Sequence, residues 1–158
     1  MQLSLLEKSS IFDLAKDCCS GRNNNQLTRF VIADGLSADL AELINGAKEP
    51  VFQIGPTDDP TRLISKVLKR QRQEDQFVEE LHLIAHGSQE GIYFGGQFID
   101  ANELENSAVE LGSWNLKRIV LWSCYIGSNS QWIDKLEDLT GAEAVSYTHL
   151  TLPTILLV

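Results

Sequence analysis

Short apolar runs that look like β-strands alternate with segments that carry helix signals, and this alternation constrains the fold more than any other feature. The expected strands are residues 29–34, 50–54, 80–85, 117–122 and 142–146. The third run, from Glu80 to Ala85, is apolar nearly throughout, as the central strands of parallel sheets are. The alternation predicts a doubly wound α/β fold with a mostly parallel sheet and right-handed crossovers.

Capping residues mark where the intervening helices begin. Asp59 and Pro60 form a helix start, because a capping carboxylate is followed by proline at the first helical position. Asp100 begins a later helix, with Glu103 three residues on in a capping-box arrangement. The remaining signals are a helix start at Ser37, another at Ser128, Asn129 or Ser130, a helix stop at Gly141, and a small hairpin over 91–99 that turns at Gly95-Gly96.

Charge and hydropathy exclude several classes of protein. The 158 residues include 13 Lys and Arg against 22 Asp and Glu, which gives a net charge of −9. Such a chain repels phosphate backbones, so we expect no nucleic-acid partner. The apolar runs are much shorter than the roughly 18 residues of a membrane-spanning helix. Glu7, Lys8 and Asp13 interrupt the N-terminal segment, so we expect no signal peptide there.

The cysteines and histidines do not indicate a metal site. The three cysteines, Cys18, Cys19 and Cys124, are an odd number and form no C-x-x-C motif. His82 and His86 are four residues apart, but on a strand this spacing spans roughly 13 Å, which is too far to share an ion. No phosphate-binding loop motif is present. We therefore expect no metal or organic cofactor, and a structural role for His82.

Two reactive side chains are expected to leave the sheet at the same edge. The third strand ends in Ala-His-Gly-Ser at residues 85–88, and the fourth ends in Trp-Ser-Cys at residues 122–124. Functional residues of open α/β sheets lie just beyond the carboxyl ends of the strands. Cysteine chemistry needs a thiolate, a nearby base and donors for the oxyanion. The sequence predicts Cys124 as nucleophile, His86 as general base, and the Gly87 and Cys124 amides as oxyanion donors.

Three further residues are candidate supporting groups for this site: Asp34, Ser88 and Ser123. Asp34 ends the first strand, where it could orient a partner or form a cap or turn. A structural interpretation of the pair also remains open. Cys124 could be a small buried apolar residue, and His86 a hydrogen-bonded structural one.

Several motifs resemble one bacterial family. They are Leu-Ile-Ala-His-Gly-Ser at 83–88, Gly-Ile-Tyr-Phe-Gly at 91–95, Ile-Val-Leu-Trp-Ser-Cys at 119–124, and Leu-Thr-Gly-Ala at 139–142. Together with Val-Ile-Ala-Asp at 31–34, they resemble the domain of unknown function DUF4347. The resemblance covers residues 29–146. It implies an exported or cell-surface location, at the start of a larger protein that continues into repeat domains.

The His-Gly and Cys layout is also similar to the caspase-like cysteine peptidases, including gingipain, separase and the CHAT domains. This similarity implies a three-layer α/β/α fold, a catalytic dyad of His86 and Cys124, and a protein or peptide substrate. Two positions depart from the DUF4347 pattern: Ala85 replaces the usual Ser before His-Gly, and Ser123 replaces the usual Gly before Cys. The alternative function is a non-catalytic N-terminal module for binding, anchoring or export in a large repeat adhesin.

The two ends of the chain differ from the middle. Residues 1–28 are weakly patterned, and we expect a weakly ordered segment there. Residues 147–158 carry no charge and resemble a translated sequencing adapter. We therefore expect a non-native tail that packs poorly, and a natural chain that continues beyond about Ser146. The domain proper is expected to be 29–146.

Overall fold

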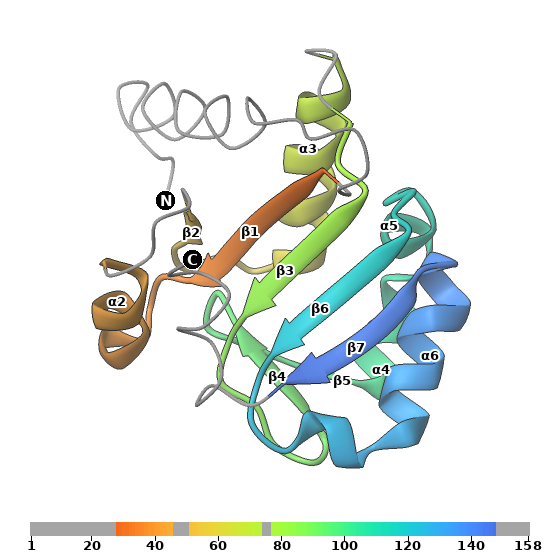
Figure 1. Cartoon of the computed structure of the whole chain (residues 1–158). Coiled ribbons are helices and arrows are strands. Elements are labelled where there is room, and N and C mark those ends of the chain that lie inside the picture. Colours follow the sequence, from red (N-terminus) through yellow and green to blue (C-terminus); the bar gives the residue numbers. More distant parts are fainter. Residues whose placement is uncertain (1–27, 46–50, 74–76, 148–158) are drawn as a thin grey trace.

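A five-stranded parallel sheet organises the chain (Figure 1). The computed structural model describes residues 28–45, 51–73 and 77–147. The sheet has the order β2-β1-β3-β6-β7, and all four neighbouring pairs are parallel. Its strands are β1 (Arg29–Asp34), β2 (Phe52–Ile54), β3 (Glu80–Ile84), β6 (Arg118–Trp122) and β7 (Glu143–Tyr147). The predicted α/β fold with a mostly parallel sheet is confirmed, and each strand lies within two residues of its expected bounds.

Helices lie on both faces of the sheet but unequally, because within the described ranges a single helix packs on one of them. The larger core lies on the face packed by α3 (Pro60–Gln73), α4 (Ala101–Asn106), α5 (Ala108–Gly112) and α6 (Ser130–Thr140). On the opposite face, Leu40 and Ile44 of α2 (Ala38–Asn45) form a buried cluster with Val31, Ala33 and Ile84. None of the helices in the described ranges is both long and apolar enough to cross a membrane.

The direction of chain winding reverses between β1 and β3. From β1 the chain moves outward to β2, returns past β1 to β3, and continues through β6 to β7. Open α/β sheets bind ligands at such a switch point, beyond the carboxyl ends of the strands. The reversal therefore makes the loops that follow β1 and β3 the first place to look for a site.

Helix caps and turns form at the residues that the sequence analysis predicted for them. The Asp100 carboxylate accepts a hydrogen bond from the Glu103 amide at 2.9 Å, and Asn129 caps α6 through the Trp132 amide at 3.1 Å. Gly141 ends α6 in the left-handed conformation, with φ 71°. The hairpin of β4 (Gly91–Phe94) and β5 (Gln97–Asp100) turns at Gly95-Gly96, where φ is 61° and 83°. Positive φ at both turn residues suits the twist of a two-residue hairpin loop.

The structure differs from the sequence-based expectations in two places. The segment after Asp100 forms two short helices, because Ser107 leaves the helical conformation (φ −98°, ψ 17°) between α4 and α5. Serine competes for backbone hydrogen bonds and weakens a helix interior. Tyr147, expected to begin a poorly packed tail, instead ends β7 and stacks on Trp122 with ring centroids 5.0 Å apart. The rest of that tail, and Cys18 and Cys19, lie outside the described residues.

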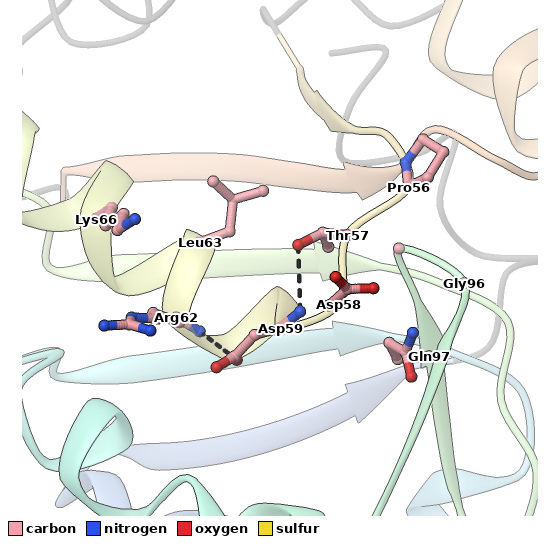
Figure 2. A pocket seen from close by; sticks show the side chains of 10 residues that line it. Pro56, Thr57, Asp58, Asp59, Arg62, Leu63, Lys66, Gly96 and Gln97 are labelled. Atoms are coloured by element: carbon pink, nitrogen blue, oxygen red, sulfur yellow. Dashed lines mark hydrogen bonds between the residues drawn. The ribbon is translucent and has the colours of Figure 1, made fainter. Parts of the chain in front are cut away.

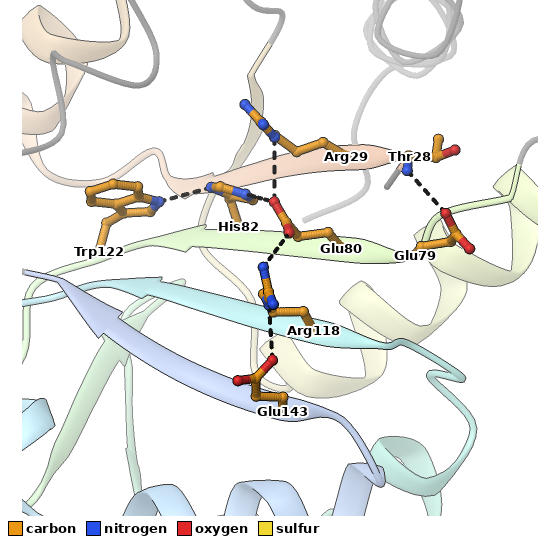
Figure 3. A network of polar contacts seen from close by, with 8 residues as sticks. All are labelled: Thr28, Arg29, Glu79, Glu80, His82, Arg118, Trp122 and Glu143. Atoms are coloured by element: carbon orange, nitrogen blue, oxygen red, sulfur yellow. Dashed lines mark hydrogen bonds and ion pairs between the residues drawn. The ribbon is translucent and has the colours of Figure 1, made fainter. Parts of the chain in front are cut away.

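A row of alternating charges crosses the amino-terminal end of the sheet (Figure 3). Register places Arg29 beside Glu80, Glu80 beside Arg118, and Arg118 beside Glu143. Glu80 is buried and lies 3.4 Å from Arg29 and 3.6 Å from Arg118. A slip of one strand by one residue would move its charge to the opposite face, so the row favours the observed register.

The same face gives His82 a structural environment. The buried His82 ring lies between Glu80, whose Oε1 is 2.6 Å from Nε2, and Trp122, whose Nε1–H donates to Nδ1 at 2.9 Å (Figure 3). Both ring nitrogens are thus engaged, Nε2 by Glu80 of the same strand and Nδ1 by Trp122 of the neighbouring strand β6. This arrangement supports the interpretation of His82 as a structural residue.

Candidate active site

The register of β3 and β6 brings His86 and Cys124 to the same edge of the sheet. Ile84 pairs with Trp122 in the parallel ladder, and each candidate residue follows its strand by two positions. The ladder continues past the strand ends through a 3.2 Å hydrogen bond from the Ala85 amide to the Trp122 carbonyl. Both side chains are partly exposed. The backbone register of the two neighbouring strands therefore brings a histidine and a free thiol to the same carboxyl edge of the sheet.

Gly87 lets the loop after β3 approach the loop after β6 closely. A Cβ atom on Gly87 would lie 2.1 Å from the Ser123 hydroxyl and 2.8 Å from the Cys124 carbonyl oxygen. Real Cβ atoms essentially never come so close to other heavy atoms. Only glycine fits between the two strand ends, because Ser123 and the Cys124 carbonyl occupy the space that a side chain would need.

The sequence predicts the Gly87 and Cys124 backbone amides as the oxyanion donors. Within the described part of the chain, neither the Gly87 amide nor the Cys124 amide donates a hydrogen bond. Gly87 forms an antiparallel bridge with Ile92, but the hydrogen bonds of this bridge come from the adjacent residues. The Ser88 amide donates to the Gly91 carbonyl, and the Tyr93 amide donates to the His86 carbonyl. An oxyanion hole needs such uncommitted backbone donors beside a nucleophile.

Asp39, which the sequence analysis did not select, is the carboxylate that contacts His86. The His86 Nε2 atom lies 3.1 Å from Oδ1 and 2.9 Å from Oδ2 of Asp39. The hydrogen bond from His86, and to a smaller extent the charge of its ring, holds the pKa of the Asp39 carboxyl below its usual value. A carboxylate can only accept, so Nε2 carries the proton and Nδ1 is the basic nitrogen of the neutral ring.

Asp39 escaped prediction because its partner is distant in sequence. It lies in the first turn of α2, 47 residues before His86, and reaches the ring only because β1 is the neighbour of β3. An acidic residue in a first helical turn normally indicates no more than a favourable interaction with the helix dipole. Nothing in the sequence distinguishes an Asp39 that only favours the helix dipole from one that also contacts His86.

Asp34 and Ser88, two of the supporting candidates, have structural partners instead. Asp34 is buried; its Oδ1 accepts from the Leu36 amide at 3.3 Å and the Gly95 amide at 3.2 Å, and its Oδ2 accepts from the Ser37 hydroxyl at 3.2 Å. It therefore forms a turn and also holds the tip of the hairpin. The Ser88 hydroxyl accepts from the Glu90 amide at 3.2 Å.

Ser123 packs directly beneath the site. It is 2% exposed, its amide donates to the Tyr147 carbonyl at 3.1 Å, and its hydroxyl has no hydrogen-bond partner among the described residues. Its neighbour across the ladder is Ala85, one residue beyond the Ile84–Trp122 pair. The two departures noted at residues 85 and 123 thus lie next to each other on adjoining strands.

Asn129 ties the two loops of the site together. Its side-chain NH2 donates to the Gln89 carbonyl at 2.6 Å, while its Oδ1 caps α6. One residue thus fixes the loop after β3 relative to the helix that follows Cys124. This connection supports the relative placement of His86 and Cys124.

A separate hollow lies beyond the end of β2, at the start of α3 (Figure 2). Its volume is about 590 Å³, and its walls include Asp58, Arg62, Lys66 and the hairpin turn. Asp59 is engaged there as the α3 cap, with its Oδ1 3.0 Å from the Arg62 amide. Within the described ranges, no three His, Cys, Asp or Glu side chains gather closely enough to hold a metal ion.

Comparison with known protein families gives one match that spans most of the chain. The model of the domain of unknown function DUF4347 matches residues 30–151. The chain belongs to this family. No match was found among curated proteins or among solved structures. The DUF4347 match runs from β1 to beyond β7, so the family domain contains the whole sheet together with Asp39, His86 and Cys124.

Proposed function

We propose that this DUF4347 domain is a cysteine hydrolase of the caspase-like type, acting on peptide bonds. The observation that carries the proposal is that His86, bonded to Asp39, and Cys124 each follow paired strand ends by two residues, at the same edge of the sheet. Two observations support it: the Gly87 and Cys124 amides donate to no group in the described part of the chain, and the topological switch point lies next to His86.

The proposed reaction uses groups of this chain and water. Nδ1 of His86 accepts the thiol proton as Sγ of Cys124 attacks the carbonyl carbon of the scissile bond. The Gly87 and Cys124 amides donate to the resulting oxyanion. The C–N bond then breaks, the imidazolium passes its proton to the leaving amine, and a thioester on Cys124 remains. His86 next deprotonates water, which attacks the thioester, releases the carboxylic acid and restores the thiol.

Asp39 acts in this scheme as a positioning residue. Its carboxylate holds the Nε2–H tautomer, so that Nδ1 is the nitrogen that accepts a proton, and it stabilises the imidazolium formed during the reaction. Both side chains are well exposed, at 67% for Asp39 and 41% for His86. Solvent screens such a pair, so its contribution to folding is small, and its effect is expected in the chemistry instead.

Alkylation of Cys124 by iodoacetamide tests the proposal without a known substrate. Peptide mapping by mass spectrometry separates Cys124 from Cys18 and Cys19. In the folded domain near pH 7, Cys124 should react at least about tenfold faster than glutathione, because an ordinary thiol is only a few per cent ionised at that pH. His86→Ala should remove most of this excess. Asp39→Asn should remove part of it, while the matched control Asp59→Asn changes the net charge equally and leaves the rate unchanged.

Slow labelling of Cys124 in the folded domain would support the alternative function, a non-catalytic module. If Cys124 reacts only after denaturation, it is a core thiol, and the domain is a non-catalytic binding, anchoring or export module. A fast reaction that persists in His86→Ala would also contradict the proposed dyad. Where proteolysis is detected, Cys124→Ser should abolish it while the thermal unfolding midpoint stays close to that of the parent.

A further inference from the structure

Tyr125, the residue directly after Cys124, adopts a backbone conformation that suits glycine. Its φ is 65° and its ψ is −18°. The only other non-glycine residue with positive φ in the described ranges is Asn115, at 50°. Asparagine tolerates the left-handed region because its short side chain can bond locally, whereas a bulky side chain there is an outlier. The chain therefore keeps a tyrosine where glycine would be less strained.

Neighbouring hydrogen bonds prevent Tyr125 from relaxing. The Ile126 amide donates to the Cys124 carbonyl at 2.8 Å, which closes a tight turn around Tyr125. Both the hydroxyl and the amide of Ser128 donate to the Tyr125 carbonyl, at 2.7 Å and 3.1 Å. Ile126 is fully buried and anchors the turn in the core. The left-handed backbone at position 125 is thus imposed by the fold.

The ring of Tyr125 contributes little to folding that would offset this strain. Tyr125 is 70% exposed. Strained residues of this kind persist at sites where the strained group has a function. Tyr125 directly follows the proposed nucleophile in the chain, on a turn held by the hydrogen bonds above. An exposed aromatic ring in that position is suited to contact whatever binds at Cys124.

We infer that Tyr125 is a specificity-determining residue whose ring receives a large apolar or aromatic side chain of the substrate, next to the scissile bond. This inference rests on the proposed hydrolase function and names its substrate class. Aromatic rings pair favourably with other rings and with apolar groups. The first turn of α2 carries the exposed Asp39, and the loops that follow β2 and β3 carry the exposed Asp58 and Glu90, so an acidic side chain would be repelled.

Three peptidyl chloromethyl ketones that differ in one side chain provide the test: phenylalanyl, glycyl and aspartyl. In each reaction Sγ of Cys124 forms a bond to the methylene carbon, chloride leaves, and the thiol proton passes to His86. The phenylalanyl reagent should label Cys124 faster than the glycyl reagent by about three- to tenfold, the range an aromatic contact provides. The aspartyl reagent should be the slowest. Tyr125→Gly should bring the phenylalanyl-to-glycyl ratio close to one.

Asn115→Gly is the matched control, because it relieves the same backbone conformation away from the site and should leave the ratio unchanged. Tyr125→Gly should not lower the thermal unfolding midpoint, since glycine suits the conformation. A Tyr125→Gly domain that keeps the parent ratio, or that unfolds at a clearly lower temperature, overturns the inference. The proposed hydrolase function fails separately, if iodoacetamide labelling is slow or independent of His86.

Discussion

Replacement of Gly87 by alanine tests how tightly the two strand ends are packed. The new Cβ would lie 2.1 Å from the Ser123 hydroxyl and 2.8 Å from the Cys124 carbonyl oxygen. Neither neighbour can move easily, because Ser123 is 2% exposed and the Cys124 carbonyl accepts the Ile126 amide at 2.8 Å. Overpacking of this kind costs about 1–3 kcal/mol. For a chain of this length, a loss of about 2 kcal/mol lowers Tm by about 4–8 °C.

A second substitution separates the two contacts. Ser123→Ala removes the nearer atom and also a buried hydroxyl that has no described partner. In the Gly87→Ala background it should restore part of the lost stability, while the contact with the Cys124 carbonyl remains. A double-mutant cycle should therefore give a coupling energy of about 0.5–3 kcal/mol, as expected for residues in contact.

Gly55→Ala is the control for the chemical change itself. A Cβ at Gly55 would meet no atom within 4 Å, so the substitution should leave stability unchanged or raise it by about 0.4–1 kcal/mol. Urea denaturation followed by circular dichroism measures all four variants against the parent. If Gly87→Ala is as stable as Gly55→Ala, the close approach of the two strand ends is wrong, and with it the packing argument for the site.

Three further outcomes are expected. The pKa of the Asp39 carboxyl is lower in the folded chain than in the unfolded chain, so Asp39 should stabilise the fold above its unfolded-state pKa. This contribution should disappear as the pH falls through the folded-state pKa. NMR titration of His86→Ala should show the pKa of Asp39 returning toward its usual value. Asn129→Asp keeps the α6 cap but removes the donor to Gln89, so amide exchange should accelerate in the loop after β3 while Tm changes little. In Gly141→Ala the new Cβ would meet no atom within 4 Å, but alanine disfavours the positive φ at this position. The free energy of unfolding, measured by urea denaturation, should therefore fall by about 1 kcal/mol.

Local features of the sequence determined most of the secondary structure. Capping by Asp100 and Asn129, the stop at Gly141 and the paired glycines of the hairpin depend only on residues a few positions apart. Their effects can therefore be predicted from the sequence before any tertiary contact is known. The apolar strands were equally clear, since both faces of a parallel sheet are buried. From these elements the sequence also placed His86 and Cys124 at strand ends.

Strand order was decided only in the folded molecule, and the composition of the site follows from it. The local pattern of β1 would be the same beside any strand, so nothing in it reveals that β3 is its neighbour. That long-range pairing brings Asp39 to His86 across 47 residues, while Asp34, chosen from its position in the sequence, is engaged by its own turn and the hairpin. The strained backbone of Tyr125 has the same origin, because it is imposed by a turn anchored in the core through Ile126.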